Sequence, residues 1–440
     1  MKTYLHFLNE ISNRAAVEHG KYQSAVNWVN PYLALEYEEK RDAFISRTGS
    51  GMNWAFKNTK PWVNSLSRGC ELCGAGEWSC LFVTGICNAH CFYCPARQDL
   101  EELPQTQRLI FSDPGDYARY INRFGFSGVA LSGGEPLMVM ERTLAYIEAL
   151  RRDCDPALYM WLYTNGILAD QEKFRSLARA GLNEIRFDLG AVNYKPEVCK
   201  EASRWIEHVT VEIPAVPEDV PTLKAILPTL CSNGVTNLNL HQLRLTAYNA
   251  PKLLARNYTY LHGEQPTVLE SELAAYEIME FVIREKLPIG VNYCNFQYKN
   301  RFQKAGFRRK MATQLAYAGE VITQNGFLLT MMAETDGVQT AILQKELESL
   351  LSLPDRLILT YRGRVIENME LQGDETPYLI DLQRYRIKEG MTMEPLVIER
   401  ELLGEFLAMM LDMGHHIPED ATLFSVWQQE FIEEGMRSYF

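Results

Sequence analysis

The chain has 440 residues, 47% hydrophobic and 23% charged, which is typical of a globular protein with two or three domains. A net charge of −12 and a pI near 5.3 argue against a general nucleic-acid binder. No apolar run approaches the roughly 18 residues that span a bilayer, and the N-terminus lacks a secretory pattern. We therefore expect a cytoplasmic protein with no membrane partner.

Residues 1–69 are predicted to be a helical N-terminal extension, because aromatic residues recur there with breaks at Pro31 and Gly49–Gly51. From residue 81, β-prone and helix-like segments alternate. The expected strands are 81–84, 128–132, 158–163, 184–188, 208–213 and 236–241, and the expected helices between them are 114–124, 138–152, 169–180, 196–206 and 219–233. This alternation predicts right-handed βαβ units and a parallel sheet. The fold class is α/β, with a partial (β/α)6 TIM-like barrel over residues 70–310.

After residue 241 the pattern becomes looser, with a helix near 268–285 and a further strand at 289–293. Asn325-Gly326 predicts a hairpin across 321–329. We expect a second hairpin formed by 357–361 and 365–368, and a helix over 394–413. Residues 311–440 are therefore predicted to form a separate C-terminal α+β domain.

Three cysteines, Cys87, Cys91 and Cys94, are separated by three and then two residues just after the first expected strand. Each iron of a [4Fe-4S] cluster normally takes one thiolate, so three thiolates leave one iron open. An open iron can bind a small molecule. A zinc knuckle is the alternative, but a structural zinc site needs four ligands, so the spacing favours the cluster.

Ser132-Gly133-Gly134-Glu135-Pro136 directly follows the second expected strand. Two consecutive glycines let the backbone pass close to a ligand. The carboxyl ends of parallel strands gather at one edge of a sheet, where active sites of such folds lie. We therefore expect this turn and the three cysteines to border the same site.

The three cysteines, Tyr93 before the last of them and the Gly133–Pro136 motif together resemble the radical S-adenosylmethionine (SAM) superfamily. The resemblance implies a [4Fe-4S] cluster whose open iron chelates SAM, and an electron that cleaves SAM to a 5′-deoxyadenosyl radical. That radical abstracts hydrogen from a substrate, an oxidoreductase-type reaction. Gly133, Gly134, Glu135 and Pro136 would hold the methionine amino group, and Tyr93 would lie beside the adenine. A one-electron donor such as flavodoxin or ferredoxin is implied.

Polar residues end the later strands as well. Thr164 and Asn165 close the third strand, where many relatives have Thr-Asn-Gly, although a plain turn would explain them equally. Arg186 and Asp188 end the fourth strand and are candidates for the SAM carboxylate or ribose, or for a structural ion pair. Glu212 and His241 lie on the fifth and sixth strands and are our candidates for catalysis.

A second group of cysteines consists of Cys70, Cys73, Cys80 and Cys294. We hypothesise that these four bind an auxiliary iron–sulfur cluster or a zinc ion, the alternative being reduced, buried thiols. Six basic residues fall within 299–310. We expect them to form a solvated helix face, with an anionic substrate, a nucleic acid or an acidic electron donor as alternatives.

Residues 69–310 resemble an uncharacterised branch of the superfamily that is related to pyruvate formate-lyase activating enzyme. The matching segments include Gly69–Cys73, Glu184–Phe187, Glu212–Pro217 and Tyr293-Cys294. Gly190 stands where glycyl-radical activating enzymes commonly have lysine, which counts against that activity. No substrate is known for this branch, so a small molecule and a peptide both remain open as the substrate. Two other functions remain open: an activating or peptide-modifying enzyme acting on a polypeptide, and a metal-binding regulatory protein without turnover.

Overall fold

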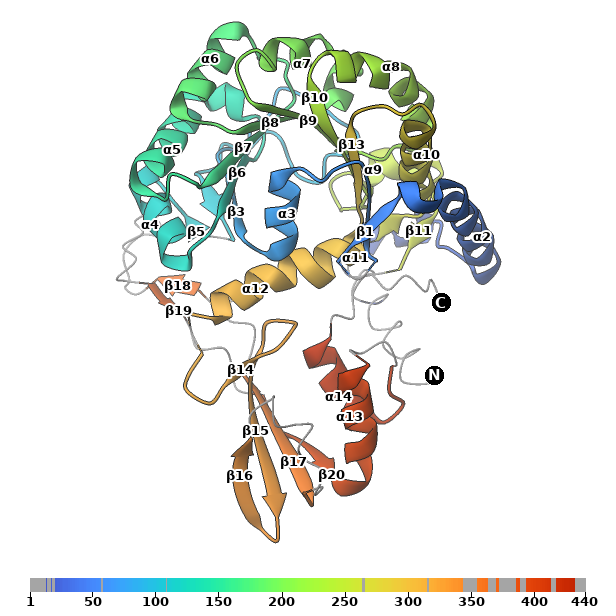
Figure 1. The fold of residues 1–440 in the computed structure, drawn as a ribbon, viewed down its shortest axis with the longest axis vertical. Helices are drawn as coiled ribbons and strands as arrows, with labels where there is room; N and C mark the ends of the chain where they lie inside the picture. Colours follow the sequence, from blue (N-terminus) through green and yellow to red (C-terminus); the bar gives the residue numbers. More distant parts are fainter. Residues whose placement is uncertain are drawn as a thin grey trace.

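The structure is a computed structural model. It describes residues 13, 17, 20–56, 58–107, 109–262, 266–314, 316–342, 354–362, 369–371, 385–387, 393–412 and 417–431. Its largest part is a curved sheet with helices on the outside, and a smaller sheet with two helices lies beyond the open side of the curve (Figure 1).

One sheet organises the large part. Within the described residues it has 11 strands, in the order β1-β2-β13-β10-β9-β8-β7-β6-β3-β4-β5. The central strands are parallel, and they are β3 (Trp78–Phe82), β6 (Gly128–Ser132), β7 (Tyr159–Thr164), β8 (Glu184–Phe187), β9 (His208–Pro214), β10 (Val235–His241) and β13 (Gly290–Cys294). They neighbour one another in chain order, as repeated βαβ units require. The predicted partial barrel is confirmed, and β13 adds a parallel strand to the six expected.

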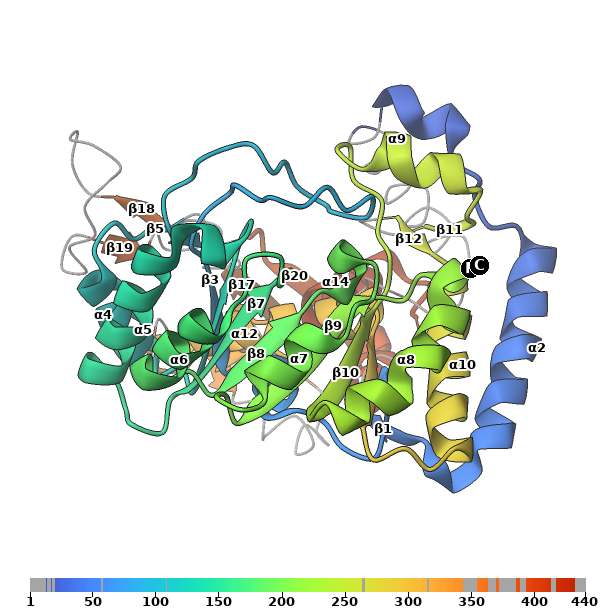
Figure 2. The same cartoon turned by 90° about the horizontal axis from the view of Figure 1, so that it is seen from above.

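Helices cover the convex face of this sheet (Figure 2). They are α4 (Pro114–Phe124), α5 (Met140–Asp153), α6 (Gln171–Ala180), α7 (Glu197–Ala202), α8 (Val220–Ser232) and α10 (Glu270–Arg284). Helix α4 begins where the Asp113 side chain accepts hydrogen bonds from two backbone N–H groups, and it ends at Gly125 in a left-handed conformation. Outward-facing strand residues such as Val129, Leu131 and Ile185 are buried in the main hydrophobic core.

The concave face is polar. Thr210, Asn239 and Asn292 are fully buried there. Helix α3 (Arg68–Ala75) lies inside the curve of the sheet (Figure 1) and contacts β3, β6 and β7. Glycine is required at two of its positions, since a Cβ on Gly69 would collide with the Arg186 guanidinium and one on Gly74 with the Phe56 ring. The barrel interior is therefore filled by a helix and a set of hydrogen-bonding side chains.

The expectation that residues 1–69 are helical throughout is wrong for residues 53–63. Helix α2 (Pro31–Thr48) does form and packs along α10, but β1 (Asn53–Ala55) and β2 (Lys60–Val63) follow as an antiparallel pair. Strand β2 pairs antiparallel with β13 at the edge of the barrel sheet. An exposed strand edge offers unpaired backbone groups, and this hairpin satisfies them. The pairing joins segments that are more than 200 residues apart in the sequence, so no local sequence pattern predicts it.

The C-terminal part is an antiparallel sheet of β14 (Val321–Ile322), β15 (Leu328–Thr335), β16 (Val338–Ile342), β17 (Arg356–Arg362) and β20 (Leu396–Glu399). Helices α13 (Leu403–Leu411) and α14 (Ala421–Glu430) share its hydrophobic core. The hairpin predicted across 321–329 is confirmed. The helix predicted over 394–413 is wrong at its start, because residues 396–399 extend the sheet as β20. The second predicted hairpin reaches residues 363–368, outside the described part.

The described structure also contains smaller elements. They include η1 (Gly20–Ala25), β4 (Gln105–Thr106), β5 (Leu109–Ile110), α9 (Ala250–Leu253), β11 (Tyr260–Leu261), β12 (Thr267–Val268), α11 (Phe296–Tyr298), a π-helical turn (Lys299–Lys304), α12 (Ala305–Ala312), β18 (Met369–Leu371) and β19 (Tyr385–Ile387), together with several short 3₁₀ turns. No helix in the described ranges is both long enough and apolar enough to cross a membrane. The domain boundaries near residues 69 and 310 stay predictions.

The fit of α3 inside the barrel yields a stability test. Gly69→Ala places a methyl group against the Arg186 guanidinium, and we expect a loss of about 1–3 kcal/mol in the free energy of unfolding, the usual cost of overpacking. The control is Gly404→Ala in α13, where an added Cβ meets no atom within 4 Å, so helix propensity should leave stability equal or higher. Urea denaturation measures both, and equal midpoints for the two variants would contradict the tight fit.

Candidate active site

A pocket of about 610 Å³ opens at the carboxyl ends of the parallel strands. This volume is in the range of small-ligand sites. The segments that follow β3, β6, β7, β8, β10 and β13 all contribute residues to its lining. The structure thus brings together the strand-end residues that the sequence singled out, as expected for a parallel barrel.

Cys87, Cys91 and Cys94 line this pocket as partly buried free thiols. The loop that carries them is tightly wound, with the Cys94 N–H donating to the Cys91 carbonyl at 3.3 Å. Burial raises the pKa of Cys91 to about 12 and shifts that of Cys87 in the same direction. A protonated thiol is a poor ligand, so a bound metal centre would be required to hold these sulfurs as thiolates.

The donor set fits an iron–sulfur cluster. All ten cysteines of the chain are free, so no disulfide competes for these three. Within the described ranges, no three His, Cys, Asp or Glu side chains are placed around a single metal-ion position. A cluster is larger than one ion, and its thiolate ligands stand farther apart than those of a zinc site. The three loop cysteines therefore suit a cluster with one iron left for another ligand.

The glycine pair beside the loop has a packing role. The Gly134 N–H donates to the Thr84 carbonyl and the Glu135 N–H to the Ile86 carbonyl, both at 2.7 Å. A Cβ on Gly133 or Gly134 would collide with these same carbonyl groups, and Gly133 also has a φ of +125°. The glycines thus let the turn after β6 lie directly against the chain that enters the cysteine loop.

Glu135 ties two strand ends together. It is fully buried, and burial raises the pKa of its carboxyl group. Its oxygens accept hydrogen bonds from Thr164 Oγ1 at 2.8 Å and from the Asn165 N–H at 2.7 Å. Asn165 Nδ2 then donates to Asn88 Oδ1 at 2.7 Å and lies 3.5 Å from the Cys87 sulfur. Pro136 is buried and begins a short turn of 3₁₀ helix. These residues support the cysteine loop through contacts that the sequence motif does not reveal.

Tyr93 and Asp188 meet across the pocket. The Tyr93 hydroxyl donates to the Asp188 carboxylate at 2.7 Å. Burial raises the pKa of Asp188 to about 6, although this hydrogen bond opposes the shift. A side chain at residue 190 would meet the Tyr93 hydroxyl. Glycine at residue 190 therefore leaves room for the Tyr93 ring and its bond to Asp188.

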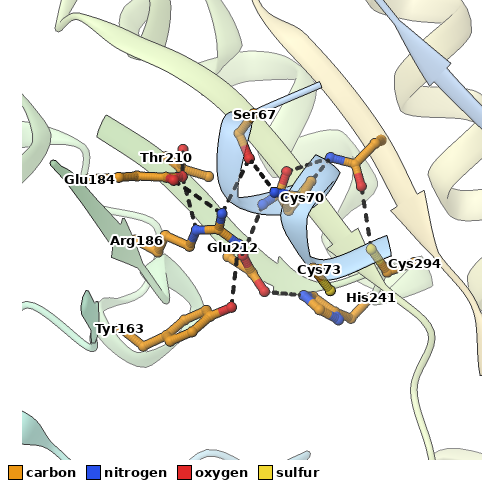
Figure 3. Close-up of polar contacts among 12 residues, drawn as sticks. Ser67, Cys70, Cys73, Tyr163, Glu184, Arg186, Thr210, Glu212, His241 and Cys294 are labelled. Atoms are coloured by element: carbon orange, nitrogen blue, oxygen red, sulfur yellow. Dashed lines mark hydrogen bonds and ion pairs between the residues drawn. The ribbon is translucent and has the colours of Figure 1, made fainter. Parts of the chain in front are cut away.

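Arg186 is the centre of a buried ion-pair network (Figure 3). Its guanidinium bonds Glu184 Oε1 at 2.9 Å and Glu212 Oε2 at 2.7 Å, and it donates to Ser67 Oγ at 3.2 Å. The Arg186 side chain is only 3% exposed. Of the two roles expected for Arg186, the structural ion pair accounts for these contacts.

Glu212 also joins a chain of three ionisable groups. Its Oε1 lies 2.5 Å from His241 Nε2, and His241 Nδ1 lies 2.9 Å from Lys299 Nζ. Burial opposes ionisation of Glu212, but Arg186 and His241 hold its pKa well below the usual range. Burial and Lys299 lower the pKa of His241. The partners therefore fix a neutral imidazole that donates from Nε2 to Glu212 and accepts at Nδ1 from Lys299.

Lys299, Gln303 and Arg244 line the pocket and were missed as site residues. The basic segment 299–310 is not a uniformly solvated face: Lys299 faces the pocket, and Arg308 donates from Nε to the Asn325 carbonyl at 2.8 Å, tying α12 to the C-terminal sheet. The signal that could have found Lys299 is its place five residues after the end of β13, equivalent to the polar residues that follow the other strands.

Three of the four auxiliary cysteines gather around a lysine. Lys60 Nζ donates to Cys294 Sγ and to Asn292 Oδ1, both at 2.7 Å. Burial opposes the charge of Lys60, but Cys294, Cys70 and Cys73 hold its pKa above the ordinary value. Asn292 also reaches Cys70, at 3.8 Å.

The remaining contacts separate Cys80 from this group. Gln303 Nε2 donates to Cys73 Sγ at 2.8 Å. Cys80 lies on β3 and packs with the apolar cluster of Leu72, Ala130 and Trp161. Cys70, Cys73 and Cys294 therefore lie together around Lys60. The contacts of Cys80 are those of a packing residue.

The sequence of the chain is similar to those of several known proteins. Residues 81–211 match the family model described as the Radical SAM superfamily. A putative glycyl-radical enzyme activating enzyme of Methanocaldococcus jannaschii is 27% identical over 281 residues, 60% of this chain and 73% of that protein. A GTP 3′,8-cyclase of Nautilia profundicola is 22% identical over 79% of this chain and 94% of its own.

Solved structures match more distantly. The TsrM methyltransferase of Kitasatospora setae aligns with a TM-score of 0.29 and 17% identity over 39% of this chain and 38% of its own. SuiB of Streptococcus suis with bound S-adenosylmethionine aligns with a TM-score of 0.34 and 12% identity over 49% of each chain. The chain thus spans about two fifths to one half of these first solved structures.

The ion-pair network predicts a large effect of one substitution. Arg186→Met leaves Glu184 and Glu212 buried without their shared cation, and we expect a loss of about 3–5 kcal/mol in the free energy of unfolding. Arg204→Met is the matched control, because its partner Glu201 and Arg204 itself are solvated, and about 0–1 kcal/mol is expected. Urea denaturation compares them, and a similar small loss in both variants would refute the structural role of Arg186.

Proposed function

We propose that this chain, whose residues 81–211 match the Radical SAM superfamily model, is a radical SAM enzyme that cleaves SAM reductively and abstracts hydrogen from a small substrate bound in the 610 Å³ pocket. The observation that supports this most is the position of Cys87, Cys91 and Cys94. They are three free thiols on one tight loop at the mouth of a parallel barrel, and they line the pocket that holds the other strand-end residues.

Cys87, Cys91 and Cys94 would hold a [4Fe-4S] cluster through three of its irons. When bound, the cluster supplies the electron that cleaves SAM to methionine and a 5′-deoxyadenosyl radical. A one-electron donor such as flavodoxin or ferredoxin would act with the protein. A reducing compartment such as the cytoplasm suits a chain with ten free thiols.

The remaining residues would bind and orient. Gly133, Gly134, Thr164 and Asn165 line the pocket beside the cysteine loop and would border the amino acid moiety of SAM. Tyr93, held by its hydrogen bond to Asp188, would lie against the nucleoside. Packing of Tyr22 and Val26 from the N-terminal segment with Phe92 and Tyr93 would keep water from this side of the pocket.

Lys299, at the end of the Glu212–His241–Lys299 chain, would contact the substrate. Lys299 and His241 both line the pocket, and the neutral imidazole can accept a proton at Nδ1 from the ammonium group. A carboxylate, an imidazole and an ammonium group in series can hold and move a proton. We assign these residues to the substrate side because Glu212 lies on β9, His241 ends β10 and Lys299 follows β13, away from the turns after β6 and β7.

Formation of 5′-deoxyadenosine tests the main proposal. Anaerobically reconstituted protein, given dithionite and SAM, should release 5′-deoxyadenosine, and Cys91→Ala should abolish it because one iron loses its thiolate. Cys154→Ala serves as the control, since this partly buried thiol lies outside the pocket lining. Chromatography with mass detection measures the product. Wild-type protein that carries a cluster but yields no product would favour the regulatory protein without turnover.

We also propose an auxiliary iron–sulfur centre at Cys70, Cys73 and Cys294. Lys60 is fully buried, and its bonded partners in the described structure are an amide oxygen, the Cys294 sulfur and the Tyr298 ring. A buried ammonium group needs a nearby anion, and thiolates bound to a metal centre would provide one. A zinc ion is the alternative occupant, and the metal analysis below distinguishes the two.

Metal analysis tests this second centre. We expect anaerobically purified protein to retain iron beyond the roughly four atoms of the first cluster. The Cys70→Ala/Cys73→Ala/Cys294→Ala variant should lose this excess, while the Cys87→Ala/Cys91→Ala/Cys94→Ala variant should keep it. Iron and zinc are measured by plasma mass spectrometry. About four irons in both wild-type protein and the first variant would reject the auxiliary centre.

A second candidate is activation of a polypeptide by hydrogen abstraction. It is favoured by the similarity to the putative glycyl-radical enzyme activating enzyme of Methanocaldococcus jannaschii, and Gly190, which replaces the expected lysine, weighs against it. A glycine-bearing peptide loop would need no cation in the pocket. The positive charge of the pocket wall therefore distinguishes the two candidates.

A further inference from the structure

Two cations share one wall of the pocket. Arg244 follows β10 and Lys299 follows β13, and both line the cavity. Both also lie against the same ring, that of Phe296: the Lys299 ammonium is 4.9 Å from its centroid and the Arg244 guanidinium 5.7 Å. An anion bound at this wall would be attracted by both cations.

Lys299 keeps donors available for such an anion. Among the described residues, its contacts are His241 Nδ1 at 2.9 Å and the Phe296 ring, and neither is an anion. An ammonium group has three N–H donors, so the bond to His241 leaves two. Burial lowers the pKa of Lys299, and the charge of Arg244 adds to this effect. Both influences would be offset by a bound anion.

The nearest carboxylate on this wall is already engaged. Glu212 accepts from Arg186 at 2.7 Å and from Asn239 at 2.8 Å through one oxygen, and it bonds His241 through the other. The pocket as a whole is lined by five basic residues and three acidic ones. The charges of Arg97 and Arg186 are balanced by Asp99 and Glu184, so binding of an anion would fall to the wall that carries Lys299 and Arg244.

We propose that Lys299 and Arg244 bind an oxyanion, a carboxylate or phosphate group, of the substrate. This assignment rests on the proposed function and narrows its substrate to small anionic molecules. Glu212 and His241 are positioning residues for this site. Glu212 fixes the imidazole tautomer, and the imidazole orients the Lys299 ammonium toward the pocket. The second candidate, a peptide glycine, offers no group that would need this pair.

Binding of simple anions tests the assignment. Isothermal titration calorimetry would be performed anaerobically on the cluster-loaded protein, with and without saturating SAM. Succinate probes for a carboxylate site, inorganic phosphate for a phosphate site, and succinamide serves as the uncharged analogue. We expect saturable one-site binding of one of the two anions and none of succinamide, and the anion that binds identifies the chemistry of the site.

Variants connect the binding to the two residues. Lys299→Met should raise the dissociation constant of the anion about tenfold or more, the effect of losing a charge-assisted hydrogen bond. Lys299→Arg should recover part of the lost affinity. Arg244→Met provides an independent test if Lys299→Met fails to fold. Lys286→Met is the control, because this exposed lysine lies just before β13, at the opposite end of the strand from the pocket. It should bind within twofold of the wild type.

Three outcomes would overturn the assignment: no saturable binding of either anion, equal affinity in the Lys299→Met and Lys286→Met variants, or loss of anion binding when SAM is present. The last would mean that the pair holds the carboxylate of SAM itself. Release of 5′-deoxyadenosine is measured on the same preparation. Turnover of SAM without anion binding would overturn this inference alone, whereas anion binding without SAM cleavage would overturn the proposed function alone.

Discussion

The barrel depends on the charge balance around Arg186. One guanidinium group lies between two carboxylates on the concave face of the sheet, and none of the three side chains is more than 9% exposed. Each of these charges would be costly to bury alone, and together they satisfy one another. The same guanidinium reaches Ser67, the residue that caps α3. The network therefore holds the central helix in the barrel as well as the charges of β8 and β9.

This constraint extends to the pocket. Because Arg186 and Asn239 fix one oxygen of Glu212, the other oxygen points at His241. The imidazole then presents its second nitrogen to Lys299. Each group in this series has its protonation state set by the previous one, so the ammonium group at the pocket wall is oriented by a charge inside the barrel. Buried polar networks can specify a geometry in this way when every member is satisfied.

Local patterns predicted the barrel well. The helix over 114–124 and the strand over 128–132 match α4 and β6 residue for residue, because a helix cap and a short apolar run are encoded within a few residues. Local patterns failed where partners are distant. Strand β2 forms against β13, and β20 forms against β17, and neither pairing leaves a signal in its own segment. Lys299 was misassigned for a similar reason: a basic run resembles a solvated face until the sheet places its first residue at the pocket.

The site motifs were predicted as ligand contacts, and the structure adds a supporting role to each. Gly133 and Gly134 make room for the chain that enters the cysteine loop, and Glu135, Thr164 and Asn165 bond that loop to two strands. Such roles depend on contacts across the fold and cannot be derived from spacing. They also explain why the loop can be rigid without metal, since its geometry is set by neighbouring backbone as well as by thiols.

Helix α3 connects the second group of cysteines to the pocket wall. Ser67 Oγ accepts from Arg186 Nη2 at 3.2 Å and from the Cys70 N–H at 3.3 Å. The backbone of Cys70 and the guanidinium that orients Glu212 therefore bond the same hydroxyl group. Burial raises the pKa of the Cys70 thiol, and the charge of Arg186 opposes this rise, because electrostatic interactions are weakly screened inside the barrel. Arg186 thus links the thiol of Cys70 to the carboxylate that orients His241 and, through it, Lys299.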